Sequence, residues 1–267
     1  MPTIQANNIT IAYDIEGAGE PLVLIAGLGY DRWMWHRMIP GLAENFQVIS
    51  YDNRGVGGSD VPPGPYTAQL LAQDLAGLLQ ALRVEKTAVL GHSMGGFVAQ
   101  AFALDYPEMV SKLILSATNF GGPNHVPVSQ EALLVLMDTQ SDAVTRLRNG
   151  IKISTAVGWV ENNADFFEEW AAHRTNNPVD PAGYQAQLAV GLSLMSAEAC
   201  FEGKLKNIQM PTLILFGVED KVVPLGNAQL LADQIPDSRI KILPGVGHFY
   251  PFEDAARAVT TVTDFLL

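Results

Sequence analysis

The chain has 267 residues, 48% of them hydrophobic and 16% charged, which is the composition of a compact globular protein rather than of a disordered one. Its formal net charge of -12 argues against a nucleic-acid surface, because phosphate binding needs clustered Lys and Arg. The single cysteine, Cys200, allows no intrachain disulfide, the start lacks a signal-peptide pattern, and no run reaches the roughly 18 apolar residues that span a bilayer. We therefore expect a cytoplasmic protein with no nucleic-acid or membrane partner.

Short runs rich in Val, Ile and Leu predict β-strands along the chain. They span 21–27, 46–52, 86–92, 112–118, 211–217 and 238–245. The first five are almost continuously hydrophobic and bounded by Gly or Pro, which is typical of strands buried on both faces of a parallel sheet. Helical patterns at 67–82 and 96–107 lie between them, and alternation over 8–17 predicts an antiparallel start. The expected fold class is α/β, with a mostly parallel twisted sheet and helices on both faces.

Residues 120–196 break this rhythm, because no strand-like run occurs there. Four helical patterns cover 129–138, 141–153, 159–174 and 181–195. An all-helical block between two strands of one sheet indicates an insertion rather than a separate domain. We expect a core formed by 1–119 and 197–267, with 120–196 as a helical cap.

The stretch "VLGHSMGG" places Ser93 between the end of a predicted strand and the start of a helix. A residue in so sharp a turn needs a positive φ, and its neighbours tolerate almost no side chain, which explains Gly91 and Gly95. The turn would hold the Ser93 hydroxyl above the carboxyl ends of the strands. It also sets the Met94 backbone N–H at a helix start, where a developing negative charge is favoured.

A serine nucleophile needs a base, and the base needs an orienting acid. Glu219 and Asp220 follow the predicted strand at 211–217, and His248 follows the one at 238–245. Because the carboxyl ends of parallel strands lie at one edge of the sheet, we expect these residues at the same edge as Ser93. His92, inside the turn, is better explained by packing or hydrogen bonding than by direct chemistry, and the remaining histidines show no metal-type spacing.

With these motifs the chain resembles the α/β-hydrolase superfamily over essentially its whole length. "GHSMG" is similar to its nucleophile elbow, "YDNRGVGGSD" to its arginine turn, "FGVEDKVVP" to its acid loop and "GVGHF" to its histidine loop. The resemblance implies a catalytic triad of Ser93, Asp220 and His248, and selects Asp220 over Glu219. The loop "DVPPGPYT", the chain length and the helical cap are also similar to those of 3-oxoadipate enol-lactonases.

The same resemblance implies an oxyanion hole built from the backbone N–H groups of Leu28 and Met94. The sequence departs from the family at Ala26, where a histidine that often braces this loop is usual. Trp33, in the apolar cluster beside the loop, is a candidate substrate contact. No metal or cofactor is implied.

The leading hypothesis is a serine hydrolase that cleaves a small carboxylic ester or lactone through an acyl-enzyme on Ser93. A carbon–carbon bond hydrolase or a perhydrolase would use the same triad, and a ligand-binding signalling protein on this fold stays open as a non-enzyme alternative. Substrate carboxylates would have few cationic partners, since only Arg146, Arg148 and Arg174 in the cap are candidates. The sequence leaves the acyl group and the oligomeric state open.

Overall fold

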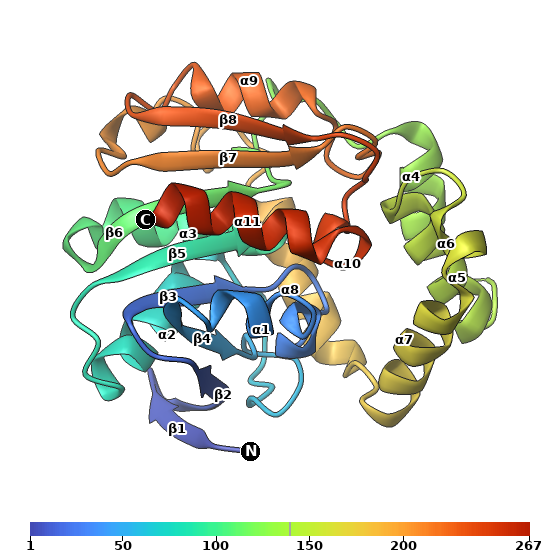
Figure 1. Ribbon diagram of the computed structural model, residues 1–267, viewed down its shortest axis with the longest axis horizontal. Helices are drawn as coiled ribbons and strands as arrows, with labels where there is room; N and C mark the ends of the chain where they lie inside the picture. The colour runs from blue at the N-terminus through green and yellow to red at the C-terminus, as the bar shows by residue number, and fades with distance from the viewer. Residues whose placement is uncertain (139) are drawn as a thin grey trace.

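A computed structural model describes residues 1–138 and 140–267 and contains an eight-stranded sheet. The strands are β1 (Thr3–Ala6), β2 (Ile9–Glu16), β3 (Glu20–Ile25), β4 (Phe46–Tyr51), β5 (Thr87–His92), β6 (Val110–Ser116), β7 (Thr212–Gly217) and β8 (Ser238–Leu243). Their order is β1-β2-β4-β3-β5-β6-β7-β8. The pairs β1–β2 and β2–β4 are antiparallel, and the pairs from β4–β3 to β7–β8 are parallel. The predicted antiparallel start and mostly parallel sheet are confirmed (Figure 1).

Helices cover both faces of the sheet. They are α1 (Ile39–Leu42), α2 (Ala68–Ala81), α3 (Met94–Asp105), α4 (Gln130–Leu136), α5 (Ala143–Ser154), α6 (Trp159–Asn162), α7 (Ala164–Asn176), α8 (Pro181–Ser193), α9 (Gly226–Ala232), α10 (Tyr250–Glu253) and α11 (Ala255–Leu266). One hydrophobic core joins α2, α3, α8 and α9 to the sheet, and a second joins α1 and α11 to its other face. The α/β class predicted from the alternation of strands and helices is confirmed.

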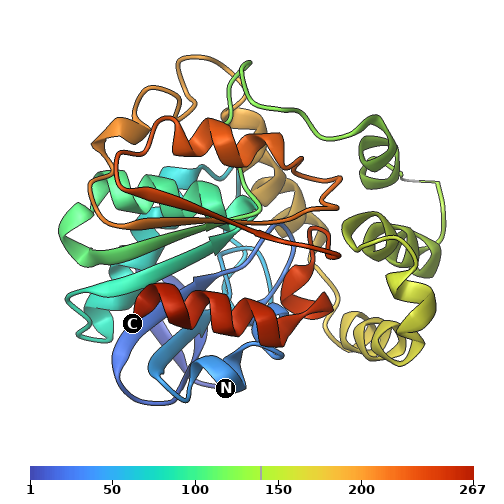
Figure 2. The same cartoon turned by 45° about the horizontal axis from the view of Figure 1, so that its top comes forward.

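The segment between β6 and β7 carries helices α4 to α8. Four of them, α4 to α7, stand to one side of the sheet, whereas α8 returns to it (Figures 1 and 2). Ala186 and Val190 of α8 are buried in the same core as α3. The last predicted cap helix is therefore a structural bridge between the α4–α7 group and the core.

The predicted helix over 159–174 is divided into α6 and α7 at Asn163. The Asn163 backbone has φ -133° and ψ 50°, outside the helical region, and its side chain donates to the Trp159 carbonyl at 2.8 Å. An asparagine side chain can hydrogen-bond to nearby backbone groups in competition with the helical hydrogen bonds. Asparagine therefore favours helix ends over helix interiors. Prediction of one continuous helix here was wrong for that reason.

Among the described residues, no helix has the length and apolar character needed to cross a bilayer.

Candidate active site

Ser93 lies in the turn that joins β5 to α3. Its backbone has φ 56° and ψ -119°, a left-handed conformation that non-glycine residues rarely adopt. The Ser93 N–H donates to the Ser116 carbonyl at 2.9 Å, and the Thr118 hydroxyl donates to the Ser93 carbonyl at 2.9 Å. The end of β6 thus holds the strained turn in place, and such strain is concentrated at functional sites.

The glycines around Ser93 are required by close backbone approach. A Cβ on Gly91 would lie 2.2 Å from the Gly95 carbonyl oxygen, and one on Gly95 would lie 2.2 Å from the Ile25 carbonyl oxygen. A Cβ on Gly96 would meet the Thr118 side chain at 2.4 Å. These contacts pack the start of α3 against the ends of β3 and β6, as the sequence predicts.

Asp220 and His248 meet at the carboxyl ends of β7 and β8. The Asp220 Oδ2 lies 2.8 Å from the His248 Nδ1, and both residues are buried. The other carboxylate oxygen, Oδ1, accepts the Val222 N–H at 2.9 Å and the Val223 N–H at 2.7 Å. The acid loop therefore fixes the carboxylate so that one oxygen is free to face the imidazole.

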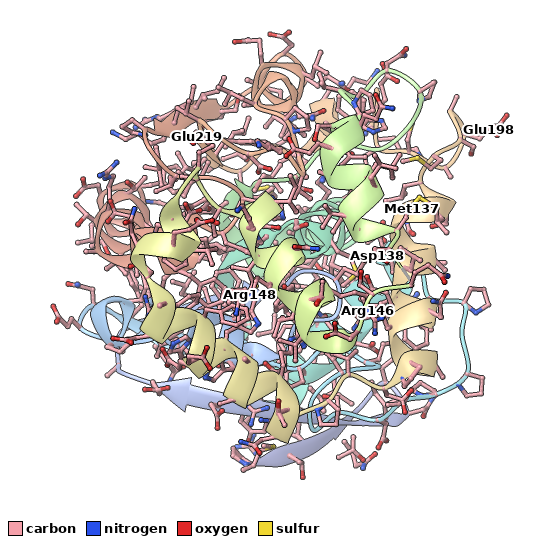
Figure 3. All side chains as sticks on the ribbon, turned by 90° about the vertical axis from the view of Figure 1, so that its right-hand side faces the viewer. Met137, Asp138, Arg146, Arg148, Glu198 and Glu219 are labelled. Carbon is pink, nitrogen blue, oxygen red and sulfur yellow. The ribbon has the colours of Figure 1, made fainter. Side chains whose placement is uncertain are left out.

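Glu219, the competing acid, is directed elsewhere. Its Oε2 accepts the Val157 N–H at 3.1 Å, in the connection between α5 and α6 (Figure 3). The geometry therefore favours Asp220 as the partner of His248, and it gives Glu219 a contact with the predicted cap.

The imidazole of His248 lies beside the serine turn, with its ring centroid 4.7 Å from that of His92. His92 is fully buried, and its Nδ1 lies 2.7 Å from the Ser116 hydroxyl, which is in turn hydrogen-bonded to the Tyr250 hydroxyl. Burial, and secondarily the nearby His248, hold the pKa of His92 well below its usual value. His92 is accordingly neutral at neutral pH, and its contacts agree with the structural role expected for it.

The loop after β3 faces Ser93. An ideal Cβ on Gly27 would lie 3.3 Å from the Ser93 Cβ and 3.8 Å from its Oγ, so a side chain there would point at the hydroxyl. Tyr30 N–H donates to the Gly27 carbonyl at 3.2 Å, closing a turn in which Gly29 has φ 71°. Leu28 is the second residue of this turn. Its N–H donates to no acceptor among the hydrogen bonds of the described residues.

Met94 is the first residue of α3, and the first N–H groups of a helix have no intrahelical partner. The predicted oxyanion donors, Leu28 and Met94, thus flank Ser93 from the β3 loop and from α3. Their assignment as donors stays a prediction, as does that of the triad.

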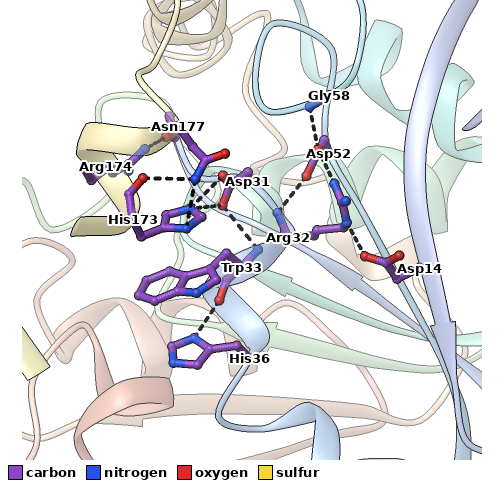
Figure 4. Close-up of polar contacts among 11 residues, drawn as sticks. Asp14, Asp31, Arg32, Trp33, His36, Asp52, Gly58, His173, Arg174 and Asn177 are labelled. Atoms are coloured by element: carbon purple, nitrogen blue, oxygen red, sulfur yellow. Dashed lines mark hydrogen bonds and ion pairs between the residues drawn. The ribbon is translucent and has the colours of Figure 1, made fainter. Parts of the chain in front are cut away.

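Trp33 has a different neighbourhood. Its indole is stacked between the rings of His36, at 4.0 Å, and His173, at 4.2 Å, and His173 is bonded to Asp31 (Figure 4). These four residues line a cavity of about 590 Å³ between α7 and the start of the chain. Of the described residues that line it, none is a triad candidate. Substrate contact by Trp33 stays a prediction.

Glu253 was not singled out from the sequence, yet it touches the histidine loop. Its carboxylate accepts the Gly247 N–H at 2.8 Å and the Ala156 N–H at 2.7 Å. Burial is the main cause that raises the pKa of Glu253 to about 7, against the effect of these two donors. Since its partners are 6 and 97 residues away, no local pattern could have marked it.

The pKa of Glu253 predicts a pH-dependent stability. Below about pH 7 the folded protein keeps this proton, whereas the unfolded chain loses it near pH 4.5, so the folded state binds more protons in between. The free energy of unfolding should therefore fall by on the order of 3 kcal/mol between pH 4.5 and 7 through this group. Urea unfolding of the wild type and Glu253→Gln at several pH values isolates the effect, because the other titrations cancel in the difference. Parallel profiles for the two proteins would contradict it.

Among the described residues, no group of three His, Cys, Asp or Glu side chains is placed to hold a metal ion. The predicted site residues are Ser93, His248, Asp220 and the backbone N–H groups of Leu28 and Met94. Together they can activate a hydroxyl and receive an oxyanion.

Comparison with known proteins agrees with the fold. The family model described as "alpha/beta hydrolase fold" matches residues 20–255. A poly(3-hydroxyalkanoate) depolymerase of Ectopseudomonas oleovorans is 32% identical over 92% of this chain and 84% of its own. A 2-hydroxy-6-oxononadienedioate/2-hydroxy-6-oxononatrienedioate hydrolase of Paraburkholderia phymatum is 31% identical over 97% of this chain and 91% of its own.

Among solved structures, the enol-lactonase from Burkholderia xenovorans LB400 superposes with a TM-score of 0.84 over 99% of each chain, at 24% identity. That identity speaks for the fold alone, and the fold agrees with the resemblance seen in the sequence. Because the family model covers most of the chain, the protein belongs to the α/β-hydrolase fold family.

Proposed function

We propose that the protein is a serine hydrolase that cleaves a small, moderately apolar carboxylic ester or lactone. The observation that carries the proposal is the 2.8 Å contact between Asp220 and His248 beside a strained turn that presents Ser93 to the β3 loop. Catalysis explains why a nucleophile, a base and an orienting acid lie on three different strand ends, whereas a structural role does not.

The reaction follows from these positions. His248 takes the hydroxyl proton as the Ser93 Oγ attacks the substrate carbonyl, and Asp220 stabilises the imidazolium that forms. The Leu28 and Met94 N–H groups receive the oxyanion. Collapse of the tetrahedral intermediate leaves an acyl group on Ser93, while His248 gives its proton to the departing alcohol. In a lactone the alcohol stays attached to the acyl group.

Water then completes the cycle. His248 takes a proton from water as the water oxygen attacks the acyl carbonyl, and it returns that proton to the Ser93 Oγ as the carboxylic acid leaves. In this scheme residues 120–196 form the cap. Its segment 154–157 contacts the loops that hold Asp220 and His248. The Phe249 N–H donates to the Ser154 carbonyl at 2.8 Å, next to His248.

Three cap arginines were the candidates for binding a substrate carboxylate, and all three have other partners. Arg174 donates to the Gly29 carbonyl at 2.8 Å, and Arg148 lies over the Phe167 ring at 4.1 Å. Arg146 donates to the Ser141 carbonyl, near Arg148 in Figure 3. These engagements support an uncharged ester or lactone over a substrate that carries extra carboxylates.

A carbon–carbon bond hydrolase is the second candidate, because one relative at 31% identity bears such a name. Its substrate would be a dioate, which the engaged arginines disfavour. A panel of short 4-nitrophenyl esters, lactones and a ring-fission dienoate separates the two.

The proposal is tested by labelling the protein with a fluorophosphonate and locating the adduct by mass spectrometry. We expect one adduct, on Ser93, and turnover of a short ester at many per second. An adduct on another residue would overturn the site. Labelling without turnover, with a large rise in melting temperature on adding a ligand, would instead favour the signalling alternative.

A further inference from the structure

The turn that carries Leu28 is held by side chains from the helical segment 120–196. The Gly29 N–H donates to Gln187 Oε1 at 2.9 Å, and the Gly29 carbonyl accepts from Arg174 Nη1 at 2.8 Å. Gln187 lies on α8 and Arg174 on α7. Both backbone polar groups of the residue after Leu28 are thus bonded to this segment, 145 and 158 residues further along the chain.

Gln187 is built into a fixed orientation. It is fully buried, and its amide nitrogen donates to the Arg54 carbonyl at 2.8 Å while its oxygen faces Gly29. A carbonyl can only accept, so the amide cannot turn over without losing both bonds. The Arg54 guanidinium is itself bound at both ends to Asp74 of α2, with contacts of 2.5 Å. Gln187 therefore connects the Gly29 turn to Arg54, which is itself anchored to α2.

Other contacts fit the turn closely to the same two helices. A Cβ on Gly29 would lie 2.9 Å from the Tyr184 ring, one turn before Gln187 on α8. The Arg174 guanidinium also lies over the Tyr30 ring, 4.4 Å from its centroid. By contrast, the methyl group of Ala26 can make no hydrogen bond, and the Asn53 side chain donates to the Ala26 carbonyl at 3.3 Å. The polar support of the turn comes mainly from α7 and α8.

We propose that Gln187 and Arg174 are positioning residues that set the direction of the Leu28 N–H, so that the oxyanion hole is assembled only when α7 and α8 are docked. The inference rests on the proposed function, since it assigns these residues to the hole of that same site. An N–H group must be aimed at the place where charge develops. The two bonds hold the peptides on either side of Gly29, directly after Leu28, and a shift of this part of the turn would move the Leu28 N–H off that place.

The first test is Gln187→Met, which keeps the volume of the side chain and removes both hydrogen bonds. We expect kcat for 4-nitrophenyl butyrate to fall by about 10- to 100-fold, less than the loss of a whole oxyanion donor, with KM changed by less than about twofold. Affinity for propyl trifluoromethyl ketone, which forms a tetrahedral adduct, should fall in parallel with kcat/KM. Gln185→Met, at an exposed position of the same helix, is the matched control and should leave both values unchanged.

A second variant keeps the test decisive if Gln187→Met does not fold. Arg174→Met removes the bond to the Gly29 carbonyl but retains an apolar stem against Tyr30, and Arg174→Lys restores a donor. We expect the same loss of kcat and of ketone affinity in Arg174→Met, smaller than for Gln187→Met, with partial recovery in Arg174→Lys. Because both side chains hold Gly29, the two losses should combine less than additively in the double variant.

The outcomes separate this inference from the proposed function. If the wild type labels on Ser93 and turns over esters, but folded variants at positions 187 and 174 keep kcat and ketone affinity within twofold, the positioning role is wrong and the hydrolase proposal stands. If the variants change melting temperature alone, the contacts are structural only. If the wild type neither labels nor turns over, the proposed function fails first.

Discussion

Replacing Ser93 by alanine is expected to lower kcat for the best ester by more than about a thousandfold. In the proposed mechanism the Ser93 Oγ is the atom that forms the acyl-enzyme, so loss of this nucleophile removes the covalent route altogether. What remains would come from the oxyanion hole and from substrate binding. The measurement is steady-state hydrolysis of 4-nitrophenyl butyrate, with fluorophosphonate labelling of the same samples.

The backbone of Ser93 supplies a way to separate loss of chemistry from loss of folding. Its φ of 56° with ψ -119° is a conformation that glycine adopts without strain. Ser93→Gly should therefore be as inactive as Ser93→Ala but more stable than the wild type, by about 1 kcal/mol. A protein that is inactive and yet harder to unfold cannot owe its inactivity to misfolding.

Ser193→Ala serves as the control for this series, because Ser193 lies at the exposed end of α8. Among the described residues, its hydroxyl donates only to the Val190 carbonyl. It should retain full activity. Residual activity above about a thousandth in Ser93→Ala, once wild-type contamination is excluded, would show that another residue is the nucleophile.

The strands and their ends could be predicted from the sequence because the information is local. A buried parallel strand reads as a continuous apolar run, and its carboxyl end is fixed by the run itself. Strand ends predict Ser93, His248 and the pair Glu219 and Asp220 as site candidates although they are far apart in the chain, and the family resemblance selects Asp220. The structure places Asp220 and His248 in contact, and it places His248 beside the serine turn.

Helix α11 was not predicted, because its stretch "AVTTVT" is rich in β-branched residues that favour strands. Burial of Ala258 and Val262 against the sheet outweighs that preference. The bonds made by Gln187 were also missed. A glutamine in an apolar helix is a weak signal, and its partners become known only when α8 is docked on the core.

Replacing Asp220 by asparagine is expected to lower kcat about 10³- to 10⁴-fold while the protein stays folded. The reason is the fixed orientation of this side chain, whose Oδ1 accepts the N–H groups of Val222 and Val223. An asparagine would keep its oxygen toward those two donors and turn its NH₂ group toward His248. The His248 Nδ1 would then have to accept, so the proton would sit on Nε2, where it blocks removal of the hydroxyl proton from Ser93.

Glu219→Gln is the matched control, because it makes the same chemical change at the adjacent position. Glu219 accepts only the Val157 N–H among the described hydrogen bonds, and a glutamine oxygen can do the same. We therefore expect kcat within about threefold of the wild type. Measured side by side at pH 8, the two variants assign the acid: a large loss in Glu219→Gln with little loss in Asp220→Asn would reverse the assignment. Equal losses would mean that the pair acts on His248 through the shared loop rather than through one carboxylate.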